Sequence, residues 1–172
     1  SLFAYQQEEI EPDIIALAKG LGGGFPVGAV LAKAKVGDAM IPGTHGSTFG
    51  GNPLAMRSAN AVLDLLLENN FLDNLKKMIL YFDKKMDELI KFDLDKSPIL
   101  HQKKGSGMLR GFQLVEKVTA GDFGNIARDK GLLLVGAAEN TIRLLPPLNT
   151  SKEEVDQAFD ILQNVILEMK KN

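Results

Sequence analysis

The sequence contains no cysteine and no tryptophan, and it has only two histidines in 172 residues. The absence of cysteine excludes disulfide bonds, thiolate nucleophiles and zinc–thiolate sites. Neither histidine stands in a spacing typical of metal ligands. No apolar run approaches the roughly 20 residues that a membrane-spanning helix needs. We therefore expect no metal site and no membrane segment, and we expect a location in the reducing cytoplasm.

The chain also lacks a strong charge of either sign. Twenty Lys and Arg residues against 22 Asp and Glu residues give a net charge of -2. This balance provides no global basic field for nucleic acid or an anionic membrane. The basic pair Lys103-Lys104 is short and has no aromatic residues between its charges, so we interpret it as structural. With 45% hydrophobic residues, the chain is typical of a globular domain whose partner is a small molecule or another protein.

The first half of the chain predicts two neighbouring strands of a buried sheet, followed by long helices. The apolar run 14–18 ends at the glycine cluster 20–24, which we interpret as a flexible loop, and a second apolar run covers 27–32. Short apolar runs bounded by glycine and proline are typical of buried strands. Asn52 and Pro53 have the residue types of an N-cap and a first helical position.

The second half has a different pattern. An amphipathic helix is expected from Phe71 to Ile90. Short segments punctuated by glycine follow Pro98, and a capping box at residues 151–154 predicts a final helix. Further elements are expected at 99–101, 108–114, 121–130, 132–135 and 141–145. The pattern predicts a small α+β domain, with a division of the chain into 1–92 and 93–172.

Lys19 is the first candidate for chemistry. It ends the first apolar run and immediately precedes the glycine-rich loop. A lysine with a buried stem can have its pKa lowered from about 10.4 by desolvation, which makes the amine a nucleophile. The alternative, which these residues alone favour, is a lysine at a strand end that extends into water.

A second candidate is the polar loop 43–52 ahead of the predicted helix. It contains Ser47, Thr48 and several glycines. Hydroxyls and unpaired backbone amides at such a position suit a phosphate or a carboxylate. A solvated loop with an N-cap explains the same residues equally well.

Together these two segments resemble the class III pyridoxal-phosphate aminotransferases, and within them the acetylornithine aminotransferases. The matching residues are PDIIALAKGLGGGFPVGA at 12–29 and HGSTFGGNPLA at 45–55, and TIRLLPPL at 141–148 extends the resemblance. The resemblance implies an α/β fold, namely the C-terminal part of a fold-type I pyridoxal-phosphate transferase. Residues 1–92 would then be the C-terminal part of the large, cofactor-binding domain, and residues 93–172 the small α+β domain.

The resemblance also implies roles for four residues. Lys19 is similar to the lysine that holds pyridoxal 5'-phosphate covalently and moves a proton between the substrate α-carbon and the cofactor. Thr48 resembles the residue that binds the cofactor phosphate across a dimer interface, and Ser47 the residue that contacts acetylornithine. Arg143 resembles the arginine that pairs with the substrate α-carboxylate. An exposed strand arginine is the alternative for Arg143, because Ile-Arg-Leu is a weak pattern.

The implied activity is amino-group transfer between N-acetylornithine and 2-oxoglutarate, in arginine biosynthesis, by a homodimer. The alternatives are aminotransferases for ornithine, succinylornithine or 4-aminobutyrate, and a non-catalytic binding or scaffold domain of the same fold. Only 18 residues precede Lys19, too few to supply the acidic residue, the stacking aromatic and the phosphate-binding turn of the family. We therefore expect this chain to represent the C-terminal half and to be inactive alone.

Overall fold

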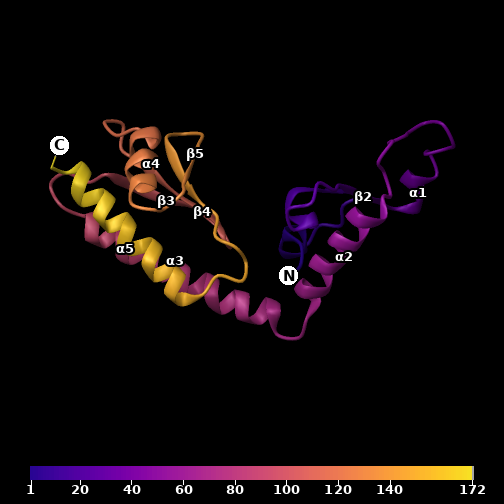
Figure 1. The fold of residues 1–172 in the computed structure, drawn as a ribbon, viewed down its shortest axis with the longest axis horizontal. Coiled ribbons are helices and arrows are strands. Elements are labelled where there is room, and N and C mark those ends of the chain that lie inside the picture. Colours follow the sequence, from indigo (N-terminus) through magenta and orange to yellow (C-terminus); the bar gives the residue numbers. More distant parts are fainter. Residues whose placement is uncertain (172) are drawn as a thin grey trace. The chain divides into compact units, whose positions relative to one another are not determined.

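The computed structural model describes residues 1–171, which form two compact units, residues 1–72 and residues 73–171. The division falls near the start of helix α3, Phe71–Asp93, because the apolar face of α3 belongs to the core of the second unit. The domain boundary expected near residue 93 concerns the complete domains of the family and stays a prediction. Figure 1 shows both units, with labels on α2 in the first unit and on α3, α4 and α5 in the second.

The first unit contains a two-stranded antiparallel sheet and one long helix. Strands β1 (Ile14–Leu17) and β2 (Ala29–Ala32) pair along their full length, from Ile14 opposite Ala32 to Leu17 opposite Ala29. The prediction of two neighbouring strands is confirmed. The prediction that this sheet is buried is wrong for this chain, because the Val30 side chain is 72% exposed. A sheet of two strands has too little covering structure in this unit to exclude water from both faces. The elements are η1 Ala4–Gln7, β1 Ile14–Leu17, η2 Lys19–Gly22, β2 Ala29–Ala32, α1 Ala34–Gly37 and α2 Pro53–Leu67.

Helix α2 begins where the sequence predicts. Pro53 occupies the first turn, and the Asn52 side chain accepts a hydrogen bond from the Ala55 amide at 3.0 Å. The cap satisfies an amide that the helix itself leaves without a partner.

The second unit is a four-stranded antiparallel sheet with helices. Its strands lie in the order β3 (Leu100–Ser106), β4 (Leu109–Leu114), β6 (Thr141–Leu144) and β5 (Val135–Ala137). Phe112 of β4 pairs with Ile142 of β6 at the centre. The predicted capping box is confirmed, because the Ser151 hydroxyl accepts from the Glu154 amide and Glu154 accepts from the Ser151 amide. Of the element expected at 132–135, only Val135 lies in a strand, and this strand continues to Ala137. The elements after α3 are β3 Leu100–Ser106, β4 Leu109–Leu114, α4 Ala120–Asp129, β5 Val135–Ala137, β6 Thr141–Leu144 and α5 Lys152–Met169.

The core of this unit lies on one face of the sheet. Phe112 and Ile142 are fully buried against side chains of α3, α4 and α5, and Phe82 of α3 meets Phe159 of α5 edge to face. Because side chains alternate along a strand, Gly111 and Arg143 lie on the opposite face. Figure 1 shows α3 and α5 side by side within this unit. Across residues 1–171, no helix has the length and apolarity needed to cross a bilayer.

Candidate functional site

Lys19 lies at the junction between β1 and the glycine-rich segment, as its position in the sequence predicts. It is the first residue of η2 and adopts a left-handed backbone with φ of 54°. Such a conformation is uncommon for a residue other than glycine and is found more often at functional positions. The side chain is exposed in this chain, as the alternative of a lysine at a strand end that extends into water predicts. None of the other described residues forms a hydrogen bond or ion pair with its amine.

The glycines after Lys19 form a packed turn instead of the flexible loop that was expected. A Cβ at Gly22 would lie 2.8 Å from Val27 Cγ1, and one at Gly23 would lie 2.9 Å from Val62 Cγ2. The Ser58 hydroxyl donates to the Gly22 carbonyl at 2.7 Å. Close approach of α2 therefore requires Gly23, whereas Gly22 makes room for the Val27 side chain. Through Val62 and the Ser58 hydrogen bond, α2 fixes the turn that carries Lys19.

The loop before α2 presents Ser47 and Thr48 to solvent. The Gly50 amide donates to the Ser47 carbonyl at 3.1 Å, which closes a tight turn. Within residues 1–171, neither the Ser47 nor the Thr48 hydroxyl has a hydrogen-bond partner. Since Asn52 and Pro53 already complete the helix start, an anion at this loop would be held by the hydroxyls and amides of the loop.

Helix α2 connects the two candidate segments of the first unit. The loop ends at Asn52, the N-cap of α2, and Ser58 of the same helix holds the glycine turn. Six helical residues span about 9 Å. One rigid helix therefore carries the hydroxyl loop at its N-terminus and contacts the turn of Lys19 about two turns further along.

Arg143 belongs to the second unit, on the sheet face opposite the core. Its side chain is exposed, while its neighbours Ile142 and Leu144 are buried in the core. It lines a cavity of about 390 Å³ on this face. It forms no ion pair with any acidic residue of the described chain. A guanidinium in such a position can accept a carboxylate through two parallel hydrogen bonds.

Lys104 is the residue that the sequence analysis missed. It had been assigned to structure, but it lines the same cavity as Arg143. Its ammonium contacts the Glu139 carboxylate, and the hydrogen bond from Lys104 holds the pKa of Glu139 below its usual range. No local motif indicates this position, because the pairing of three strands brings Lys104 and Arg143 to one face.

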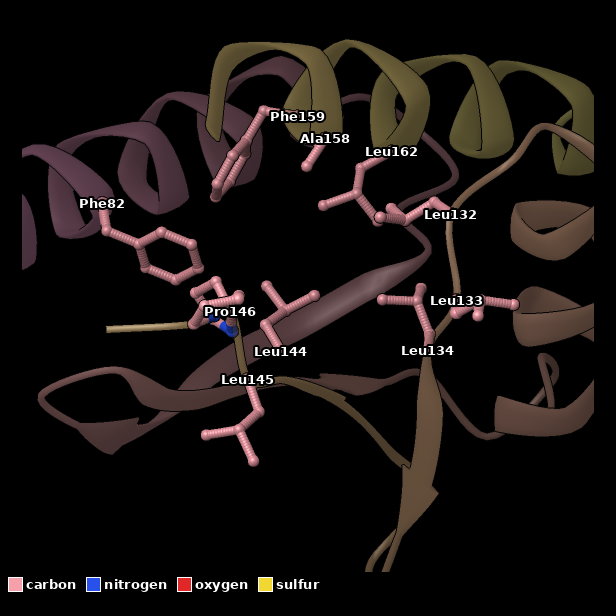
Figure 2. Close-up of a pocket in the computed structure, with 11 residues that line it drawn as sticks. Phe82, Leu132, Leu133, Leu134, Leu144, Leu145, Pro146, Ala158, Phe159 and Leu162 are labelled. Carbon is pink, nitrogen blue, oxygen red and sulfur yellow. The ribbon is translucent and has the colours of Figure 1, made fainter. Parts of the chain in front are cut away.

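A second cavity in this unit is apolar. It has a volume of about 260 Å³ and lies between α3, α5 and the end of β6. Figure 2 shows the rings of Phe82 and Phe159 together with leucines of the facing chain. Its lining has no titratable side chain, so it offers packing surface and no acid–base chemistry. The lining residues are Phe82, Leu132, Leu133, Leu134, Leu144, Leu145, Pro146, Pro147, Ala158, Phe159 and Leu162.

Comparison with known proteins gives a consistent family. Residues 1–166 match the sequence model of the family described as aminotransferase class-III. The chain is 44% identical to an acetylornithine aminotransferase of Streptococcus mutans, over 95% of this chain and 42% of that protein. It is 41% identical to one of Oceanobacillus iheyensis, over 100% of this chain and 42% of that protein.

Solved structures give the same result for the fold. An acetylornithine aminotransferase from Elizabethkingia anophelis superposes with a TM-score of 0.85 at 34% identity, over 98% of this chain and 42% of that chain. An ornithine aminotransferase from Toxoplasma gondii superposes with a TM-score of 0.88 at 30% identity, over 99% of this chain and 40% of that chain. The chain thus spans about two fifths of the length of the relatives it matches.

Proposed function

We propose, since the chain belongs to the class-III aminotransferase family, that it supplies the catalytic lysine and a substrate-binding arginine of a pyridoxal-phosphate transaminase. The amino group would pass between N-acetylornithine and 2-oxoglutarate. The relatives named above, acetylornithine aminotransferases, support this choice of amino donor. The ornithine aminotransferase of Toxoplasma gondii among the structural neighbours keeps ornithine as the alternative donor.

The observation that carries the proposal is the placement of Lys19. It lies on a strained left-handed turn that α2 holds in place through Gly22, Gly23 and Ser58. A fixed turn presents the amine in a reproducible position, as a covalent attachment point requires. Its exposed amine is free of ion pairs among the described residues, so that no carboxylate of this part of the chain competes for it.

The side chains of the first unit fit the cofactor in their chemistry. A primary amine at Lys19 can condense with an aldehyde, and the hydroxyl of Thr48 beside loop amides suits a phosphate. When bound, the cofactor would supply an electron sink for the α-carbon of the substrate. Lys19 would then hold and return the proton of that carbon as a general base and acid.

The remaining roles are assigned by the same reasoning. Arg143 would orient the substrate through its α-carboxylate, and Ser47 would contact the acetylated donor. Thr48 lies on an exposed loop, which is compatible with a contact to the cofactor phosphate of a second subunit in a homodimer. The proposal includes arginine biosynthesis as the pathway and the cytoplasm as the location.

Borohydride reduction tests the assignment of Lys19. Treatment of the cofactor-loaded enzyme that contains this chain, followed by peptide mapping, is expected to place a pyridoxyl group on Lys19. In Lys19→Ala the label should be lost, and turnover should fall by about 10²- to 10⁴-fold because the proton transfer is lost. Lys33→Ala is the matched control, since Lys33 lies in the same unit and pairs with Glu11 and Asp13. A loaded enzyme without label on Lys19 would favour the non-catalytic scaffold.

A further inference from the structure

The glycine turn that carries Lys19 is attached to helix α2 by one hydrogen bond. The backbone hydrogen bonds of the turn, such as that from the Gly23 amide to the Gly20 carbonyl at 3.1 Å, connect its residues only to one another. The Ser58 hydroxyl, in contrast, donates to the Gly22 carbonyl at 2.7 Å, across 36 positions of the sequence. Among residues 1–171, no other hydrogen bond joins α2 to this turn. Ser58 is therefore the directional contact that orients the turn on the helix.

The hydroxyl of Ser58 serves the turn and not its own helix. A serine within a helix commonly donates to the carbonyl four residues earlier, and serine is a weaker helix former than alanine. The Ser58 hydroxyl donates to Gly22 instead, and its side chain is half-buried. Helix stability alone would favour an alanine at this position, as at the neighbouring buried Ala59. The contact with the turn is thus what a serine adds here.

Lys19 needs such an anchor because its backbone is strained. Its φ of 54° lies in the left-handed region, and a residue other than glycine stays there only where the surrounding structure holds it. Lys19 and Gly22 are the first and last residues of η2, and a 3₁₀-helix has three residues per turn. Gly22 therefore lies one helical turn from Lys19. A hydrogen bond at the Gly22 carbonyl limits the rotation by which the Lys19 backbone would relax.

We infer that Ser58 is a positioning residue for the amine of Lys19, through the hydrogen bond that it donates to the Gly22 carbonyl. The inference rests on the proposed function, in which Lys19 holds the cofactor and also moves a proton. While Lys19 is attached to the cofactor, the covalent bond itself fixes the amine. When the free amine takes up and returns the proton, its position depends on the turn that carries it, and the rate of such a transfer falls steeply when the reacting atoms are misplaced. Ser58 therefore supports the proton transfer more than the covalent attachment.

Single-turnover kinetics with a saturating amino donor test this role in the cofactor-loaded enzyme that contains this chain. Ser58→Ala is expected to lower the single-turnover rate constant and kcat by about 5- to 20-fold, because the amine loses its fixed position. The KM for the amino donor should change by less than about twofold, since no substrate contact is assigned to Ser58. Ser58→Thr keeps the hydroxyl and should restore most of the rate.

Two further measurements do not depend on turnover. Borohydride reduction and peptide mapping should place the same amount of pyridoxyl label on Lys19 in Ser58→Ala and in the parent enzyme. Amide hydrogen exchange in Ser58→Ala should become faster at Phe25, whose amide donates to the Gly22 carbonyl at 3.0 Å, because the turn loses its anchor. Asn60→Ala is the matched control, since Asn60 is an exposed residue of the same helix, and it should change neither the kinetics nor this exchange.

The outcomes separate this inference from the proposed function. An unchanged single-turnover rate in Ser58→Ala, a loss that Ser58→Thr does not restore, or an equal loss in Asn60→Ala would overturn the positioning role. Loss of the Lys19 label in Ser58→Ala, or a lower thermal stability with unchanged kinetics, would show a general structural contact and would overturn it as well. A parent enzyme without label on Lys19 and without amino transfer would instead overturn the proposed function, on which the role of Ser58 depends.

Discussion

Removal of the Asp93 carboxylate is expected to destabilise the second unit more than any change at its exposed ion pairs. Asp93 is 1% exposed at the end of α3. One of its oxygens accepts from the amides of Ile99 at 2.8 Å and Leu100 at 2.6 Å. The other lies 2.7 Å from the Lys170 ammonium at the end of α5. A single carboxylate therefore ties the end of one helix to the first strand and to the last helix.

The magnitude follows from what the substitution leaves behind. Asp93→Ala removes the partner of a largely buried ammonium and of two backbone amides. Breaking a buried pair from one side costs about 3–5 kcal/mol, because the remaining charge stays desolvated. Burial by itself lowers the pKa of Lys170, but the hydrogen bonds to Asp93 and Asp95 outweigh it and raise this pKa above its usual value. Asp93→Ala removes one of the two carboxylates that raise this pKa and leaves the exposed Asp95 as the remaining partner of the ammonium.

Urea unfolding and amide hydrogen exchange measure this loss. Asp93→Ala should lower the unfolding free energy by about 3–5 kcal/mol and abolish the exchange protection of the Ile99 and Leu100 amides. Asp93→Asn keeps an oxygen for those amides, so it should retain part of their protection. Asp95→Ala is the matched control, since Asp95 pairs with the same lysine at 2.8 Å but is exposed. An Asp93→Ala effect as small as that of Asp95→Ala would refute the reasoning.

Two other predictions concern the site and the response to acid. Arg143→Lys should lower kcat/KM for every amino-acid substrate by about 10- to 100-fold. The substitution removes the bidentate contact with the substrate carboxylate, which is worth ~1.4–3 kcal/mol. The absorbance of the bound cofactor should not change and serves as the control. Hydrogen bonds from Tyr81 and Lys85 hold the pKa of Asp156 below its usual range. The Asp156 carboxylate therefore binds a proton more readily in the unfolded chain than in the folded chain. The free energy of unfolding should consequently fall as the pH falls below about 4. Tyr81→Phe should make the urea midpoint less sensitive to acid over that range, and an unchanged sensitivity would contradict the assignment.

Features with local causes could be predicted from the sequence. The start of α2 at Asn52-Pro53 and the start of α5 at Ser151 both depend on contacts within one helical turn. Their residue types therefore contain the information needed to place them. The position of Lys19 before a glycine turn could be predicted for the same reason.

Features that depend on contacts with distant parts of the chain could not be predicted from the sequence. The glycines after Lys19 were interpreted as a flexible loop, because Val62 and Ser58, which fix their conformation, lie more than thirty residues away. The exposure of Val30 could not be predicted from its apolar run, because the residues of a strand do not determine which other elements pack against it. Lys104 was assigned to structure because only the register of β3, β4 and β6 brings it to the cavity of Arg143.

The glycines of the two units have one physical role in common, which is to admit a neighbour where a Cβ would exclude it. At Gly22 the excluded neighbour is the side chain of Val27, and at Gly111 it is the backbone of Ile142. A side chain can shift by rotation, whereas the backbone of a central strand is fixed by its ladder of hydrogen bonds. The constraint at Gly111 is therefore the stricter of the two. Gly111 thus helps to shape the cavity that Lys104 and Arg143 line although it has no functional group, and the sheet register explains why no larger residue fits at this position.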